Sequence, residues 1–223
     1  MCYTGVSQCV CPREKITISS TVMSRSTNCS FTCPCGTVFT SQIYEYVNVA
    51  QDPRLRYTVL AGLLNVSTCP NCGRRAALAQ PFIYSDPDHR LLAYVHPSTS
   101  VPEEARQLIL EKLRAVYEEA EATSYTQSSP HAAEIPDLNV VFGMDQLHEL
   151  ISSALSQDER LGRLAFSTHS QSDAERGQML DIARKFAAEM KCQVDVEDLP
   201  DEYTVWLYGS RRQIGVIMRE LNP

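Results

Sequence analysis

One short phrase occurs twice in this sequence and limits what the chain can fold into. Thr-Cys-Pro-Cys-Gly stands at residues 32–36, and Thr-Cys-Pro-Asn-Cys-Gly stands at residues 68–73. Proline after the first cysteine stiffens each loop, and glycine after the second cysteine permits the left-handed backbone that such a turn needs. Four sulfurs around one ion is the arrangement that zinc takes in structural sites. We therefore expect a Zn²⁺ site with four cysteine ligands, which are Cys33, Cys35, Cys69 and Cys72.

The first phrase leaves one ligand open. Only Pro34 separates Cys33 from Cys35, so this pair is one residue shorter than the Cys-x-x-Cys spacing of the second phrase. Cys29 is the alternative to Cys35, but Gly36 repeats the glycine of the second phrase and favours Cys35. Four protein ligands close the coordination shell, which predicts a structural zinc ion, because a catalytic zinc keeps a position for water or substrate.

Composition and charge describe an ordinary globular chain with two unlike halves. Hydrophobic residues make up 43% of the 223 residues, and no apolar run approaches the length of about 20 residues that crosses a bilayer. The net charge of −7 divides into +3 over residues 1–100 and −10 over residues 101–223. With no signal peptide in view, we expect a cytoplasmic protein with reduced thiols, which favours metal binding over disulfides.

The order of strand and helix patterns divides the chain into four parts. Residues 1–28, rich in serine, threonine and cysteine, are expected to be a disordered extension, and Met23 offers an alternative start. Residues 29–100 are expected to form a zinc ribbon of short strands clipped by the ion, with a helix from Asp52-Pro53 between the two phrases. A helix over residues 102–122 and a linker follow, within residues 101–137.

Residues 138–223 are expected to be a separate C-terminal α/β domain. From residue 161 the patterns follow the order β-α-β-β-α, which is most of a ferredoxin-like sandwich. Ser172 and Ser210 are placed to cap the two helices. The predicted fold class is therefore α+β, with a small zinc-ribbon module followed by an α/β sandwich.

The two phrases stand within a longer series of short motifs. In chain order these are Cys33-Pro34-Cys35-Gly36, Val47-Asn48, Asp52-Pro53, residues 60–65, Cys69-Pro70-Asn71-Cys72-Gly73, Pro81, Tyr84-x-Asp86, His96-Pro97, Val141-Phe142 and Asp145-x-Leu147. In this series the chain resembles the bacterial CpXC-domain proteins over roughly residues 29–160. The resemblance implies the fold of that family and a bound metal, and it implies no reaction.

These patterns favour a non-enzymatic interaction or regulatory module whose partner is another protein. The first alternative is a nucleic-acid-binding zinc ribbon that uses arginines and stacking tyrosines. The second alternative is an enzyme with its site in the C-terminal domain, although His89, His96 and the His148-Glu149 pair show no partner in the sequence. The residues behind the first alternative are Arg54, Arg56, Arg74, Arg75, Tyr44, Tyr46 and Tyr57.

Overall fold

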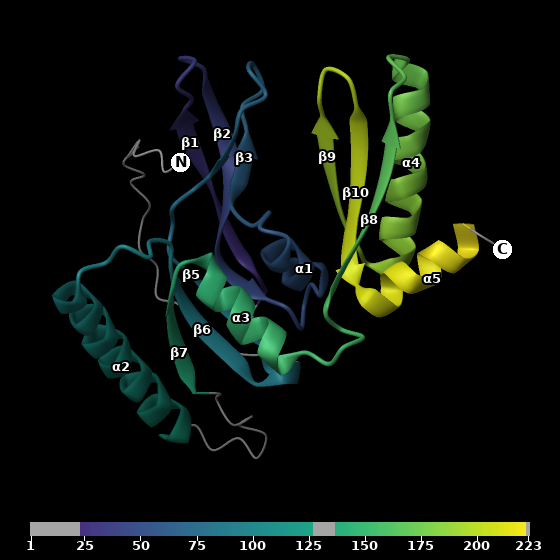
Figure 1. The fold of residues 1–223 in the computed structure, drawn as a ribbon. Coiled ribbons are helices and arrows are strands. Elements are labelled where there is room, and N and C mark those ends of the chain that lie inside the picture. The colour runs from purple at the N-terminus through teal and green to yellow at the C-terminus, as the bar shows by residue number, and fades with distance from the viewer. Residues whose placement is uncertain (1–22, 127–136, 222–223) are drawn as a thin grey trace. The chain divides into compact units, whose positions relative to one another are not determined.

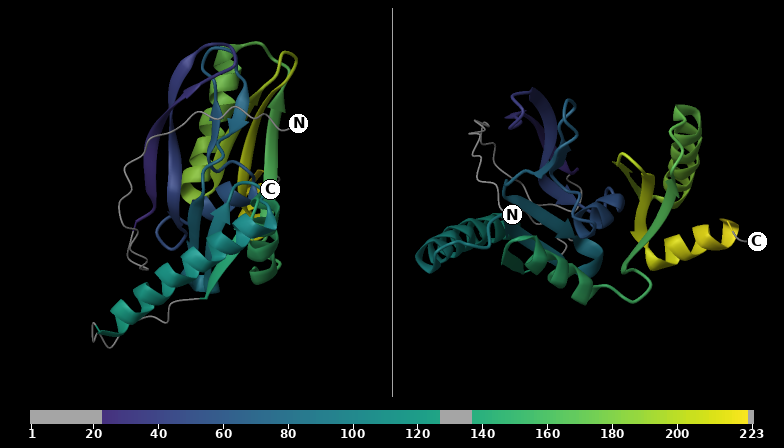
Figure 2. Two further views of the ribbon diagram at one scale, coloured as in Figure 1. Left: turned by 90° about the vertical axis from the view of Figure 1, so that its left-hand side faces the viewer. Right: turned by 45° about the horizontal axis from the view of Figure 1, so that its top comes forward.

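The computed structural model describes residues 23–126 and 137–221, which form a mixed α+β structure (Figure 1, Figure 2). Its strands make three sheets, and five α-helices accompany them. Residue contacts group the described chain into two units. The first unit holds residues 23–51, 65–126 and 137–147, and the second unit holds residues 52–64 and 148–221.

The first unit is built on a five-stranded sheet of mixed direction. Strands β2 and β5 run parallel, as do β6 and β7, and the other neighbours are antiparallel. Val47, Tyr84 and Val95 are fully buried on its strands, so the sheet has an apolar core of its own. In the sheet order, the strands are β1 (Arg25–Thr32), β2 (Val38–Asn48), β5 (Phe82–Asp86), β6 (Leu91–His96) and β7 (Leu138–Phe142).

This sheet corrects three sequence-based expectations. Strand β1 begins at Arg25, inside the stretch expected to be a disordered extension; residues 1–22 lie outside the described residues. Strand β7 pairs with β6 and so belongs to the first sheet, although the sequence placed residues 138–142 in the C-terminal domain. The strands around the first phrase belong to a sheet with a buried core, because β2 pairs with β5, whereas β3 (Val66–Thr68) and β4 (Arg75–Ala77) around the second phrase form a separate two-stranded sheet.

Helix α2 (Glu103–Thr126) lies between β6 and β7 in the sequence, close to the predicted range. Its start is fixed by Arg106, whose Nη2 donates to Thr99 O at 2.7 Å and whose guanidinium lies 4.8 Å from the Phe142 ring centroid. None of the α2 side chains that the structure describes is buried. No described helix is both long and apolar enough to cross a membrane.

The second unit confirms the β-α-β-β-α order predicted from residue 161. The sheet has the order β8-β10-β9 and is antiparallel, and α4 and α5 complete its core with Ala183, Ala187, Ile214 and Ile217. Ser210 caps the last helix, because Gln213 N donates to its Oγ at 3.0 Å. The elements are β8 (Leu161–Thr168), α4 (Asp173–Met190), β9 (Gln193–Asp198), β10 (Tyr203–Ser210) and α5 (Arg211–Leu221).

Helix α1 (Arg54–Leu60) also belongs to the second unit, although it lies between the two cysteine phrases in the sequence. Tyr57 Oη donates to Glu159 O at 3.2 Å, and Thr58 Oγ1 donates to Gln193 Oε1 at 3.3 Å. His148, in helix α3 (Met144–Ala154), lies 2.8 Å from Val59 O through its Nε2. The C-terminal sheet is therefore completed by a helix from the N-terminal half of the chain, and residues 138–223 alone do not contain this unit.

Candidate metal centre

Each cysteine phrase forms the turn of a β-hairpin. The first turn joins β1 to β2, where Cys33 N donates to Thr37 O at 2.9 Å and Gly36 N donates to Cys33 O at 2.8 Å. The second turn joins β3 (Val66–Thr68) to β4 (Arg75–Ala77) and repeats the pattern, with Gly73 N donating to Cys69 O at 3.0 Å. The backbone of each turn thus holds its cysteines before any ion is considered.

Both glycines of the phrases take the left-handed backbone that the sequence predicted for them. The φ angle is +88° at Gly36 and +68° at Gly73. No neighbouring atom lies within 4 Å of where a Cβ would stand at either residue, so the backbone angle alone favours glycine. The local sequence thereby fixes the direction in which the chain leaves each of the two turns.

The two turns bring the four sulfurs together. Cys33 Sγ lies 3.6 Å from Cys72 Sγ, and Cys35 Sγ lies 3.7 Å from Cys69 Sγ, so each contact joins one sulfur from each turn. All four sulfurs lie within 4.8 Å of one another. Sulfurs held ~2.3 Å from a shared ion at tetrahedral angles are about 3.8 Å apart. The cluster therefore has the dimensions of a single four-sulfur metal site and can bind an ion such as zinc.

Cys29 lies outside this cluster. It is buried in β1, where it pairs with Ser41 of β2, four residues before the first turn. Cys35 takes the place in the cluster that the sequence left open between these two residues. A single residue between Cys33 and Cys35 is sufficient to place both sulfurs in the cluster, because the two sulfurs of the first turn contact different sulfurs of the second turn.

The surroundings of the sulfurs are unequal. Cys33 and Cys69 are buried, whereas Cys35 and Cys72 are exposed. The Thr37 hydroxyl, 3.3 Å from Cys35 Sγ, and the Thr37 backbone N–H lower the pKa of Cys35 to about 5. The backbone N–H of Cys72 lowers the pKa of Cys69. The pKa of Cys33 is about 12, although the backbone N–H of Cys35 lowers it, because burial and the neighbouring sulfurs favour its protonated form.

These opposite shifts describe a cluster that resists holding four negative charges by itself. Like charges so close together cannot all ionise freely, and a bound cation removes that conflict because each metal ligand must be a thiolate. The chemistry of the donor set therefore agrees with its geometry. Both fit a divalent ion that prefers sulfur.

The histidines have structural partners that the sequence did not reveal. His89 Nδ1 lies 3.0 Å from Asp86 Oδ1, and Tyr84 Oη donates to Asp86 Oδ2 at 3.2 Å. His96 Nδ1 accepts from Ser98 N at 3.2 Å. His148 is half-buried against α1, although the sequence showed no partner for it. The turn spacing Asp86-Pro-Asp-His89 is the signal that could have found the first pair.

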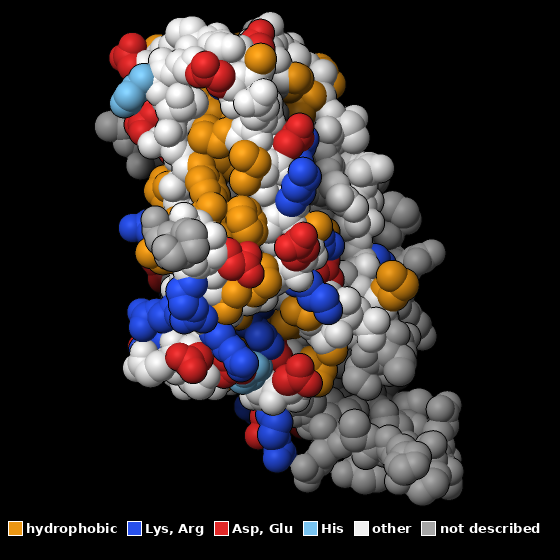
Figure 3. All heavy atoms as spheres, turned by 90° about the vertical axis from the view of Figure 1, so that its right-hand side faces the viewer, with side chains coloured by type: hydrophobic (Ala, Val, Ile, Leu, Met, Phe, Trp, Pro, Cys, Tyr) orange, Lys and Arg blue, Asp and Glu red, His pale blue; other side chains and the backbone are white. Residues whose placement is uncertain are grey.

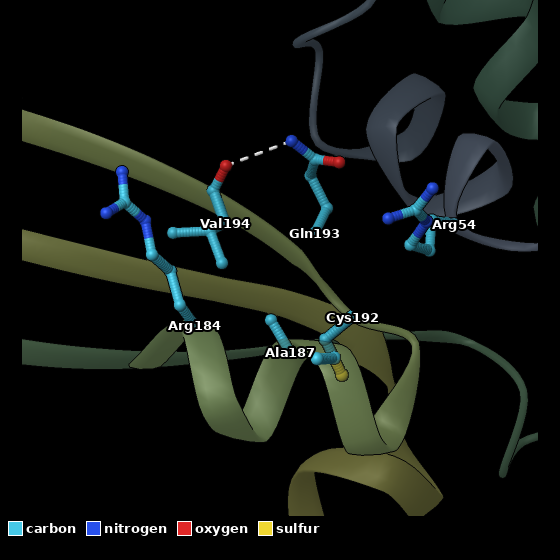
Figure 4. Close-up of a pocket in the computed structure, with 7 residues that line it drawn as sticks. Arg54, Arg184, Ala187, Cys192, Gln193 and Val194 are labelled. Atoms are coloured by element: carbon cyan, nitrogen blue, oxygen red, sulfur yellow. Dashed lines mark hydrogen bonds between the residues drawn. The ribbon is translucent and has the colours of Figure 1, made fainter. Parts of the chain in front are cut away.

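A cavity of about 290 Å³ lies in the second unit, beside α1, α4 and β9 (Figure 4). Arg54 of α1 and Arg184 of α4 stand at its two sides, and Arg54 forms an ion pair with Asp52 at 2.9 Å. Burial raises the pKa of the Cys192 thiol to about 11, so this thiol is not a ready nucleophile at neutral pH. The remaining lining residues, Ala187, Ala188, Gln193 and Val194, offer no acid or base.

The residues behind the nucleic-acid alternative differ in burial. Tyr46 and Tyr57 are buried, so neither ring is placed to stack on a base, and Arg56 is buried as well. Arg74 and Arg75 are exposed at the second turn. Three of the seven residues behind this alternative are therefore buried and not available for contact with a nucleic acid.

A comparison with known families decides the wider relationship. The family described as CpXC protein matches residues 31–161, which is more than half of the chain. The chain belongs to the CpXC protein family. The match includes both cysteine turns, α1, α3 and strands β2, β5, β6 and β7 of the five-stranded sheet, so the four-sulfur cluster is part of the CpXC region. It ends where β8 begins, so the C-terminal sheet with α4 and α5 lies outside it. No curated protein and no solved structure matches this chain.

Proposed function

We propose that this CpXC protein binds one zinc ion through Cys33, Cys35, Cys69 and Cys72, and that the ion is structural. The observation that carries the proposal is the crosswise approach of the four sulfurs at 3.6 and 3.7 Å. Sulfurs within 4.8 Å of one another leave room for one ion and not for an iron–sulfur cluster. Tetrahedral sulfur ligation is a preferred environment of zinc.

A closed four-sulfur shell leaves no position for substrate, which supports a non-enzymatic interaction or regulatory role. The exposed residues Cys35, Cys72 and Arg74 lie at the tips of the two turns, so the ion would fix the shape of a surface that another protein can contact. We place the protein in the cytoplasm, where reduced thiols remain available for zinc.

We also propose that residues 161–221 form three strands and two helices of a ferredoxin-like sandwich. The support is the β-α-β-β-α order together with the sheet order β8-β10-β9, in which the last strand lies between the first two. A complete sandwich of this kind carries a further strand beside the first. The enzyme alternative rests on the cavity beside Arg54 and Arg184, and its lining supports binding better than catalysis.

Zinc analysis of single-cysteine variants tests the metal proposal. We expect one zinc per chain in the purified protein and loss of that zinc in both Cys35→Ser and Cys69→Ser. Cys29→Ser is the matched control, because Cys29 is a buried cysteine of the same hairpin outside the cluster. Full zinc in Cys35→Ser together with loss in Cys29→Ser would contradict the ligand set. A wild-type protein purified without zinc and unable to take it up would contradict the site itself.

The nucleic-acid alternative has one observation in its favour, the exposed pair Arg74 and Arg75 at the second turn. Binding through phosphate contacts weakens steeply as salt rises. Retention on DNA or RNA that is lost in an Arg74→Ala, Arg75→Ala double variant and falls with salt would favour this alternative. Equal behaviour of the wild type and the double variant would remove it.

A further inference from the structure

The sheet of the second unit has an edge that its helices leave partly uncovered. Among the described residues, β8 pairs with β10 alone and shows no bulge. The side chains of Leu164 and Phe166 on β8 face the same side of the sheet as their partners Leu207 and Val205 on β10. The β10 pair is fully buried, whereas the β8 pair is only half-buried. The apolar core therefore continues out to the β8 edge without a cover.

Helix α4 carries an apolar flank on the side of that edge. Arg184 lines the cavity beside Val194 of β9, so the flank of α4 that bears Arg184 lies toward β9. Ile182, two residues earlier, stands on the other side of the buried Ala183 and is 48% exposed. Met179 and Phe186 follow the same flank at helical spacing and are half-buried. This flank of α4 and strand β8 therefore share one apolar surface.

Helix α5 extends this surface beyond the sheet. It starts over the beginning of β8, where a Cβ at Gly162 would lie 3.0 Å from Arg211 Cα. In Figure 1 it then continues past β8, away from β9 and β10. Met218 and Leu221, near its far end, are 49% and 40% exposed. Figure 3 shows the result as a strip of hydrophobic side chains along the face that carries these elements.

We propose that this edge is the interface between two copies of the chain, with β8 pairing antiparallel to β8 of the second copy about a two-fold axis at Ala165. In that register Leu164 of each copy lies opposite Phe166 of the other copy. The two-fold axis makes two such pairs, and in each pair the half-buried side chains cover one another. Arg163, the only charged residue of β8, lies opposite the partner's Ser167 and not opposite a second arginine. A register centred on Leu164 would instead set Phe166 against a glycine.

The charges at the two ends of β8 complement each other in this arrangement, because an antiparallel pair sets the beginning of one strand beside the end of the other. The end of β8 is strongly acidic, and at its beginning arginines outnumber acids. Near the end of β8 the acidic residues are Asp173, Glu175, Glu197, Asp198, Asp201 and Glu202, and the basic residues are Arg176 and His169. Near its beginning the basic residues are Arg160, Arg211, Arg212 and Arg219, and the acidic residues are Asp158, Glu159 and Glu220.

The far end of α5 supplies the remaining cover. It extends past the beginning of its own β8, and in the two-fold arrangement this is where the end of the partner's β8 lies. Met218 and Leu221 of one copy would then cover the Phe166 half of the other, which its own α5 does not reach. Each copy thus provides the apolar cover that the other lacks. The proposal concerns the second unit and does not depend on the metal site.

Sedimentation of the full chain across a range of protein concentrations tests this interface. We expect a reversible dimer. Ala165→Lys places two like charges directly opposite each other at the axis and should raise the dissociation constant at least about tenfold. Ala188→Lys is the matched control: it makes the same change at an exposed position of α4 on the β9 side, and it should leave the dissociation constant unchanged.

An Ala165→Cys variant tests the same interface by formation of a covalent dimer instead of loss of the dimer. Cysteines at paired positions across antiparallel strands lie within disulfide reach, so Ala165→Cys should form a covalent dimer under mild oxidation, and Ala188→Cys should not. A chain that stays monomeric at every concentration would overturn the proposal. The proposal would also be overturned if the Ala165→Lys variant remained a dimer while its thermal unfolding matched that of the wild type. Zinc content should be the same in all four variants, which separates this test from that of the metal site.

Discussion

At the scale of single residues, the two cysteine phrases work through backbone geometry as much as through sulfur. Gly36 and Gly73 have positive φ angles where the chain leaves each turn. A side chain at such a residue is strained whatever space surrounds it. The glycines therefore set the direction of the hairpins, and the cysteine sulfurs meet because both turns have the same backbone hydrogen bonds.

Replacing one of these glycines should destabilise the protein, whereas the same change in a helix should stabilise it. Gly73→Ala forces a left-handed alanine and should cost about 1 kcal/mol of unfolding free energy, with weaker zinc binding. Gly177→Ala in α4 is the control, since that glycine has an ordinary φ angle and open space around it, and it should gain ~0.5–1 kcal/mol. Urea unfolding with zinc present measures both. Equal effects of the two changes would contradict the role of the backbone angle.

At the scale of elements, α1 shows how a short helix can be held entirely by distant partners. It has only seven residues, too few to be stable alone, and all but its first residue are buried. Its hydrogen bonds reach Glu159 and Gln193, about a hundred residues and more along the chain. The helix is therefore stabilised by its tertiary contacts within the second unit, and its neighbours in sequence do not determine where it packs.

A matched pair of valines tests this packing. Val59 in α1 is 0% exposed, and Val116 in α2 is 65% exposed, so both lie in helices and differ in burial. Val59→Ala removes buried methyl groups and should lower the unfolding free energy by ~1–3 kcal/mol. Val116→Ala should be neutral or slightly stabilising, because alanine is the better helix former. Thermal unfolding of the full chain compares them. A neutral Val59→Ala would show that α1 is not part of a packed core.

At the scale of the whole molecule, the four-sulfur cluster belongs to only part of the first unit. The sequence predicted short strands clipped by an ion, yet the five-stranded sheet has buried residues such as Val47 and Val95. The β3–β4 hairpin is different, because it has three residues in each strand and those of β4 are all exposed. Few apolar contacts hold this hairpin, so metal ligation at its turn would add to the hydrogen bonds that join Asn65 and Ser67 to β2.

Removal of the metal should therefore loosen the molecule locally. Hydrogen exchange with and without a chelator should show loss of protection over residues 66–77 and at the tip of the β1–β2 hairpin. Protection should persist in β5 and β6 and in β9 and β10, because their apolar contacts do not involve the sulfurs. Uniform loss of protection across the described chain would show instead that the ion is required for the whole fold.

The sequence by itself determined the features that depend on neighbouring residues. The cysteine turns with their left-handed glycines, the helix start at Ser210 and the order of elements after residue 161 follow from local spacing and periodicity. The sequence also pointed to the residues of the cluster, with Cys29 left as the alternative to Cys35, because the repeated phrase carries both the thiols and the turns that aim them.

Only the tertiary structure decided which elements share a core. Pairing of β7 with β6 and packing of α1 against β9 and β10 join residues far apart in the chain, and an apolar pattern indicates that a face is buried without indicating which face covers it. The same reason explains the choice of Cys35 over Cys29. The distance between a sulfur and the opposite turn depends on how two hairpins pack, and that packing is a property of the folded chain.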